Sequence, residues 1–249
     1  MSIEPAIMLF AGIVFIAYAV QNAVGFGALL VCITLGSHLL DIRQIMTLAI
    51  PLSMLQSGFI VWRDRASIDA RLLLRRIMPL MSVGLVLGFV VARDLRDTHL
   101  RVVFAGLVIV LAIYELWRLR PPSDEDTPPR PPPRLASVAA IFGAGIAHGI
   151  YAAGGPLLVY AVGREGLDKH RFRATLSAVW VGLNTLLISG FVMEGRYTTD
   201  TGRDIVVLLA VLPFGLWIGD LIHQRVPERP FKITVFILLI AGAASLIVR

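Results

Sequence analysis

The sequence predicts an all-α, polytopic membrane protein of two inverted repeats, each with about five hydrophobic segments and with broken or re-entrant helices. Three observations predict this fold: an apolar composition, long uncharged runs between arginine-rich loops, and landmarks that occur twice. Hydrophobic residues make up 57% of the 249 residues and charged residues 16%, and the mean hydropathy is +0.78. A soluble domain could not bury this much apolar surface, so we expect the lipid bilayer as a partner.

The basic balance, with a formal net charge of +6, indicates a membrane surface rather than a nucleic acid. The arginines cluster between apolar runs and form no aromatic-studded basic face. The single cysteine, Cys32, excludes disulfides and cysteine-based metal centres within one chain, and we predict no cofactor. The first apolar run begins at Pro5 without a basic n-region or an Ala-x-Ala site, so we expect it to remain in the protein.

Long uncharged runs give the expected helical segments. They cover residues 5–24, 27–40, 44–62, 77–92, 100–117, 135–152, 155–163, 174–193, 205–219 and 231–248. About 20 apolar residues are needed to cross the hydrocarbon as a helix, so 27–40 and especially 155–163 are too short to cross unaided. Short apolar runs beside glycines are typical of re-entrant or broken helices.

Basic residues divide the loops into two unequal sides. One side holds Arg63, Arg65, Arg71, Arg75, Arg76, Arg118, Arg120, Arg130, Arg134, Arg164, Lys169, Arg171, Arg173, Arg225, Arg229 and Lys232. The other side holds Arg43, Arg93, Arg96, Arg101, Arg196, Arg203 and Arg249. Because cytoplasmic loops are enriched in Lys and Arg, we expect the first side in the cytoplasm and both termini outside.

A proline-rich stretch separates the two halves. It predicts three parts: a first transmembrane repeat over 1–119, a cytoplasmic linker over 120–134, and a second, inverted repeat over 135–249. Proline lacks a backbone donor and has a fixed φ, so the linker is expected to be extended and solvated. Its simplest role is that of a plain connector.

The same landmarks occur in both halves in the same order. Residues 27–31 (Gly-Ala-Leu-Leu-Val) match 155–159 (Gly-Pro-Leu-Leu-Val), and a loop aspartate follows each, Asp41 or Asp168. Further along, a proline precedes a glycine pair in each half: Pro79 with Gly84 and Gly88, and Pro213 with Gly215 and Gly219. Five segments is an odd number, so the second repeat must enter the membrane from the opposite face.

The two interruptions, residues 21–27 and 148–156, predict the substrate site. Each helix that restarts after a glycine exposes backbone N–H groups with partial positive charge, which bind anions. Polar residues flank these breaks, and Gln56 and Asn184 occupy matching places in the following long helices. The candidate substrate-binding residues are Asn22, Gly25, Gly27, Gln56, His148, Gly154, Gly155, Arg173 and Asn184.

Each candidate also has a purely structural interpretation. The amides can be interhelical hydrogen bonds. His148 can be a proton-coupled group or a neutral structural histidine, and Arg173 can anchor a cytoplasmic helix end or reach the anion. The glycine pairs at 84/88 and 215/219 most simply allow close helix packing. No catalytic motif and no Walker A sequence occurs, so we expect neither an enzyme nor a self-powered pump.

On the residues Gly25-Phe26-Gly27, Gly154-Gly155-Pro156-Leu157 and the duplication itself, nearly the whole chain resembles the TauE/SafE family of sulfite and organosulfonate exporters. Ala28 departs from the pattern, because the second half has Pro156 there. The resemblance implies export of a small sulfur oxyanion across the bacterial inner membrane, linked to protons. The rival interpretations are a passive anion channel, a membrane-embedded enzyme acting on a sulfur compound, and a metal-cation transporter, which the lack of a carboxylate or thiolate cluster disfavours.

Overall fold

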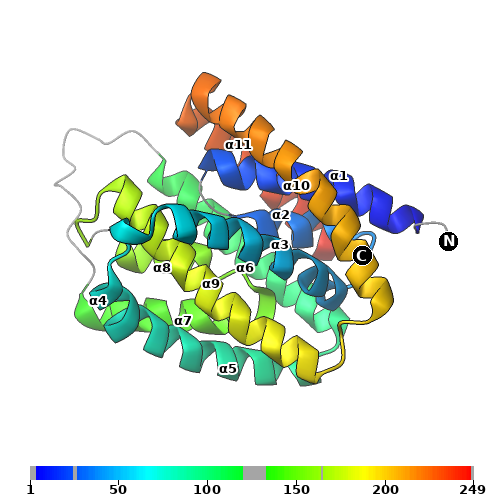
Figure 1. Cartoon of the computed structure of the whole chain (residues 1–249), viewed down its shortest axis with the longest axis horizontal. Helices are drawn as coiled ribbons and strands as arrows, with labels where there is room; N and C mark the ends of the chain where they lie inside the picture. Colours follow the sequence, from blue (N-terminus) through cyan, green and yellow to red (C-terminus); the bar gives the residue numbers. More distant parts are fainter. Residues whose placement is uncertain (1–3, 25–26, 120–132, 164, 248–249) are drawn as a thin grey trace.

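The structure, a computed structural model, describes residues 4–24, 27–119, 133–163 and 165–247. Every regular element in these ranges is helical (Figure 1). The elements of the first half are α1 (Pro5–Val24), α2 (Ala28–Gly36), α3 (Ile42–Arg63), the 3₁₀ turn η1 (Arg65–Ser67), α4 (Ala70–Leu72), the π-helix η2 (Leu73–Ile77), α5 (Met78–Asp94) and α6 (Asp97–Arg118). Those of the second half are α7 (Arg134–Tyr151), α8 (Gly155–Val162), α9 (Lys169–Met193), α10 (Thr199–Arg225) and α11 (Glu228–Ile247).

The distribution of side chains is that of a membrane protein. Among the described residues, eight helical stretches are long and apolar enough to cross a bilayer. Large apolar side chains lie on the outside of the bundle, where lipid would contact them: examples are Leu9, Phe59, Val86, Val110, Val206, Phe214 and Leu238. Buried positions meanwhile include Gln56, His148 and Asn184. The predicted all-α, polytopic membrane fold is confirmed.

The helices α2 and α8 are too short to cross a bilayer, as the sequence predicts. With 9 and 8 residues they extend about 13 and 12 Å, against a hydrocarbon thickness of about 30 Å. The predicted segment 27–40 ends earlier as a helix, at Gly36, because residues 37–40 form a turn. In the other direction, α10 is longer than the predicted 205–219, since polar residues at both ends continue the helix beyond the apolar run.

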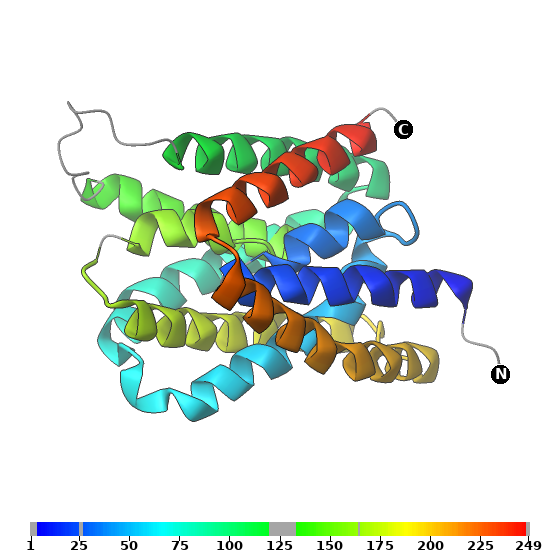
Figure 2. The same cartoon turned by 90° about the horizontal axis from the view of Figure 1, so that it is seen from above.

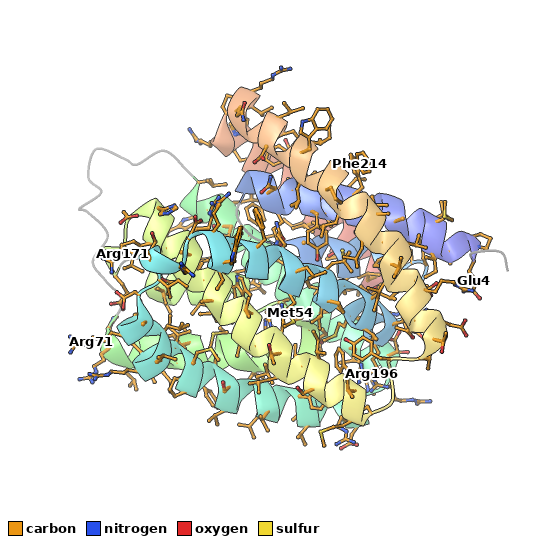
Figure 3. The ribbon with its side chains drawn as sticks, in the orientation of Figure 1. Glu4, Met54, Arg71, Arg171, Arg196 and Phe214 are labelled. Atoms are coloured by element: carbon orange, nitrogen blue, oxygen red, sulfur yellow. The ribbon has the colours of Figure 1, made fainter. Side chains whose placement is uncertain are left out.

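The molecule has two ends, which we call the terminus end and the linker end. At the terminus end α1 begins and α11 ends; at the linker end α6 ends and α7 begins (Figures 1 and 2). Arg71 and Arg171 lie at the linker end, and Glu4 and Arg196 lie at the terminus end (Figure 3). The two ends correspond to the two sides that the loop arginines define in the sequence.

Glycines hold two helix pairs in backbone contact. A Cβ atom added at Gly88 of α5 would lie 2.3 Å from the carbonyl oxygen of Ile146 in α7. In the other pair, a Cβ added at Gly219 of α10 would lie 2.6 Å from the carbonyl oxygen of Ala19 in α1. The close packing predicted for both glycine pairs is therefore confirmed.

The helix partners are exchanged between the halves. The third long helix of each half (α5 or α10) packs on the first helix of the other half (α7 or α1), while α3 packs on α9 and α6 on α11 (Figure 2). Such an exchange is what two repeats related by a two-fold axis would produce. The division into repeats 1–119 and 135–249 itself stays a prediction, and the linker falls largely on 120–132, outside the described residues.

Candidate functional site

Both predicted helix breaks are present. α1 ends at Val24 and α2 begins at Ala28, with Gly27 in a left-handed conformation at φ 107°. α7 ends because Ala152 turns into the left-handed region at φ 52°, which a residue with a Cβ rarely adopts. The chain restarts as α8 at Gly155. Of the predicted site residues, Gly25 lies outside the described residues.

A pair of glutamine side chains lies at the first break. The Oε1 atom of Gln21 accepts a hydrogen bond of 3.0 Å from the backbone N–H of Ala28, the first residue of α2. The Nε2 atom of Gln21 donates to Oε1 of Gln56 on α3. Gln21 therefore caps the N-terminus of α2, and Gln56 holds the Gln21 side chain in that position. The sequence prediction includes Gln56 but not Gln21.

At the second break, the imidazole of His148 contacts two side chains of α9. Nε2 of His148 lies 3.1 Å from Oδ1 of Asn184, and Nδ2 of Asn184 donates to Oγ of Ser53 at 3.4 Å. The Trp180 ring stacks on the imidazole, with centroids 5.3 Å apart and planes inclined by 17°. His148 is 3% exposed, and its Nδ1 atom is buried without a hydrogen-bond partner.

Helix α3 contributes one residue to each of the two polar groups. Ser53 and Gln56 lie one turn apart on the same face of α3, so α3 carries a contact to each break. Ser53 lies about half-way along α3, and its neighbour Met54 lies near the middle of the molecule in Figure 3. We call this set the central polar cluster. Its members are Gln21, Ser53, Gln56, His148, Trp180 and Asn184.

Two further predicted residues, Asn22 and Gly154, lie at the breaks but add no side chain to this cluster. Nδ2 of Asn22 donates to the carbonyl oxygen of Leu216 at 2.7 Å and to Oδ1 of Asp220 at 2.9 Å, so this amide ties α1 to α10. At Gly154, an added Cβ would lie 2.2 Å from the carbonyl oxygen of Ala144. Gly154 thus lets the second break fold tightly against α7.

Arg173 lies at the linker end and not in the central polar cluster. Its Nη2 atom is 3.3 Å from Oδ2 of Asp64, and the Arg63 guanidinium bonds both oxygens of the same carboxylate at 3.0 and 3.1 Å. The hydrogen bond from Arg63, with a further one from Arg173, lowers the pKa of Asp64 from 3.8 to about 2 although burial opposes the shift. Arg173 therefore acts first as an ion-pair partner between α9 and the end of α3.

The central polar cluster could bind an anion through uncharged hydrogen-bond donors. Its side chains offer amide, hydroxyl, indole and imidazole groups, each of which can donate a hydrogen bond. The described residues include no group of three or more His, Cys, Asp and Glu side chains that could hold a metal ion. Two interrupted helices flank the cluster, and their N-termini add partial positive charge.

The bundle combines helices long enough to cross a membrane, two short helices that follow helix breaks, and a buried polar cluster near its middle. This combination is typical of a membrane transport protein. The chain matches the family described as Sulfite exporter TauE/SafE over residues 10–246 and belongs to that family. The resemblance noted from the glycine patterns is confirmed, and the protein is one of a family of membrane transporters for sulfite and related sulfur anions. No curated protein and no solved structure shows significant similarity to this chain.

Proposed function

We propose that the protein is a secondary transporter that exports sulfite or a related small sulfonate across the bacterial inner membrane by alternating access, coupled to protons. The observation that carries this proposal is the central polar cluster. It combines neutral donors from α1, α3, α7 and α9 with the buried, unpartnered Nδ1 of His148 beside the second break. Within the family of sulfite exporters, an oxyanion with several acceptor oxygens is the ligand that such donors suit.

The substrate would bind by replacing contacts that the cluster now makes with itself. In the observed conformation, the N–H of Ala28 is occupied by the Gln21 oxygen. An anion oxygen is a stronger acceptor than an amide oxygen, so it would compete for that donor. The Asn184 amide and the Ser53 hydroxyl, 3.4 Å apart, would supply further donors.

Alternating access would move rigid helix pairs against the central pair. The glycine contacts hold α5 to α7 and α1 to α10, so each pair behaves as one unit. α3 and α9 carry the cluster residues Ser53, Gln56 and Asn184 between these units. Opening toward the linker end would require the Asp64–Arg173 contact to separate. In this proposal the linker end faces the cytoplasm and both termini face the periplasm.

His148 is the group proposed to carry the coupled proton. It is the ionisable side chain of the central polar cluster, and imidazole exchanges protons near neutral pH in ordinary surroundings. Its Nε2 atom is engaged by Asn184, which leaves Nδ1 as the atom that can gain or lose a proton as the site opens to either end.

Sulfite flux into proteoliposomes tests the proposal. Flux should saturate with sulfite concentration and should accelerate when unlabelled sulfite is present on the opposite side. A flux that does not saturate indicates a passive channel, and consumption of sulfite in detergent solution without any gradient indicates an enzyme.

For the coupling step, an imposed pH gradient should accelerate flux of methanesulfonate, whose charge is constant with pH. The His148→Gln variant should lose that acceleration; an unchanged acceleration would leave His148 structural.

A further inference from the structure

Among the side chains that the structure describes, few charged groups are buried. The buried polar side chains among the described residues are neutral with two exceptions, and His148 is the ionisable one among them: Thr34, Ser37, Thr47, Ser53, Gln56, Ser57, Ser137, His148, Thr175, Ser177 and Asn184. The exceptions, Asp64 and Glu115, are acidic and lie at the linker end of α3 and α6. Of the side chains that the structure describes, no Lys or Arg is buried.

Arg173, the arginine among the predicted site residues, forms an ion pair away from the central polar cluster. Arg173 pairs with Asp64 at the linker end, and its side chain is 47% exposed. In the central polar cluster, the donors are instead the neutral groups of Gln21, Ser53, Gln56 and Asn184, with the imidazole of His148. An anion bound there would meet dipoles and no fixed positive charge.

A neutral cage discriminates strongly between anions of different charge. The cost of moving an ion from water into a less polar interior rises with the square of its charge, whereas the hydrogen bonds that neutral donors return rise more slowly. A dianion therefore loses more on entry than a monoanion of similar size. A proton on His148 would reduce this difference, because a cation attracts a dianion about twice as strongly as a monoanion, so the discrimination is largest while His148 is neutral.

Building on the proposed transport function, we propose that the central polar cluster selects singly charged sulfur oxyanions. Hydrogen sulfite and small alkanesulfonates belong to this class, and the sulfite dianion and sulfate are discriminated against. The selectivity would rest on the lack of a fixed cation in the site as much as on the hydrogen bonds that its donors make to the anion's oxygens.

Competition against sulfite flux in proteoliposomes tests this inference. Methanesulfonate and sulfate both offer tetrahedral sulfur with three or more oxygens, but near neutral pH the first is a monoanion and the second a dianion. At equal ionic strength, methanesulfonate should inhibit sulfite flux at a concentration at least about tenfold lower than sulfate, a difference of about 1.4 kcal/mol in binding free energy. Equal or stronger inhibition by sulfate would overturn the inference, as would sulfite flux that neither anion inhibits.

A charge-adding variant provides the matched test within the same site. Gln56→Lys places a cation in the cluster, so the ratio of the two inhibitory concentrations should shift toward sulfate by about tenfold. Gln224→Lys adds the same charge at an exposed position of α10 and should leave the ratio unchanged. If Gln56→Lys does not fold, the comparison on the wild-type protein decides alone. Absence of sulfite flux in the wild-type protein would refute the proposed function itself, a result distinct from a wrong charge preference.

Discussion

Asn184 is the residue that connects the parts of the central polar cluster. Its carbonyl oxygen faces Nε2 of His148, its amide group donates to Ser53, and one turn away on the same helix Trp180 stacks on the imidazole. Two contacts from one face of α9, the Asn184 hydrogen bond and the Trp180 stack, thus hold the plane of the His148 ring. The only ring nitrogen left without a partner is Nδ1, so the protein presents one defined atom rather than a rotating ring.

Replacing Asn184 with Leu, which has the same branching at Cγ but no polar atoms, should reduce sulfite flux by about tenfold or more. The change removes both amide hydrogen bonds, and the buried Nε2 of His148 loses its partner at a cost of about 1–3 kcal/mol. Initial flux in proteoliposomes at matched protein content measures the effect. Thr185→Val is the control, because Thr185 is exposed on the next position of α9 and its hydroxyl bonds only to Val181 in the same helix. Normal flux in Asn184→Leu would remove the amide from the transport site.

At the scale of elements, helix ends and helix faces carry different kinds of contact. Within the bundle, α5 contacts α7 and α10 contacts α1 through glycine backbones. At the linker end, the end of α3 meets the start of α9 through ions: Asp64 bonds Arg63 and Arg173, and Arg171 lies 3.6 Å from Asp69. Backbone packing is insensitive to pH and salt, whereas the ionic contact responds to both.

The packed face predicts a large effect of one methyl group. Gly88→Ala would put a Cβ atom 2.3 Å from the carbonyl oxygen of Ile146, so α5 and α7 must separate and the protein should lose about 1–3 kcal/mol of stability. In contrast, Gly106→Ala on α6 adds a Cβ atom with nothing within 4 Å and should be neutral or slightly stabilising. Thermal unfolding in detergent measures both. Equal melting temperatures for the two variants would contradict the close contact of α5 and α7.

The ionic contact predicts a specific acid dependence. The pKa of Asp64 is about 2 in the folded protein, against an ordinary value of 3.8. The ionised carboxylate therefore stabilises the folded state fully at a pH well above 3.8. That stabilisation is lost as the pH falls from about 4 toward 2. Asp64→Asn should cost about 1 kcal/mol at neutral pH, because the arginine partners are half-exposed.

Melting temperatures in detergent, measured from neutral pH downward, check this expectation. The difference between wild type and Asp64→Asn should be largest above pH 4 and should shrink toward pH 2. A difference that grows with acidity would mean that the carboxylate does not stabilise the folded state through these pairs.

For the whole molecule, the placement of the two ends defines an orientation. Arg71 and Arg171 lie at the end that carries most of the basic loops, and Glu4 and Arg196 lie at the opposite end (Figure 3). The pairs α1–α10 and α5–α7 exchange places when the two halves are exchanged, as the proposed inverted repeat would require. Because the arginine distribution differs between the two ends, we expect it to decide which end faces the cytoplasm.

Cysteine labelling in intact cells should report this orientation. Asp200→Cys lies at the terminus end, where the Asp200 side chain is 75% exposed, and should react with a membrane-impermeant maleimide from outside. Arg71→Cys, exposed at the linker end, should react only after the cells are permeabilised. The native Cys32 is fully buried and should remain unlabelled. The reverse pattern of reaction would place the linker end outside.

Composition and spacing alone predicted the membrane fold, the approximate positions of most helices and the two breaks, and the glycine motifs at these breaks resembled those of the family. These depend on local properties: long apolar runs must cross lipid, and glycines beside short runs interrupt helices. The special positions of Gln56 and Asn184, which are buried polar residues, were predictable for a similar reason, because polar residues stand out in long apolar runs; their part in a substrate site stays a prediction.

Only the tertiary structure decided which polar residues meet. Gln21 and Asn22 are adjacent amides in the last turns of α1, yet one bonds Gln56 and the other bonds Leu216 and Asp220 on α10. Successive helix residues point about 100° apart, and α1 is apolar on all sides, so its sequence does not show which face meets α3. The same holds for Arg173, whose pairing with Asp64 joins residues 109 positions apart. Such partners are set by the packing of α3 on α9, which no local pattern encodes.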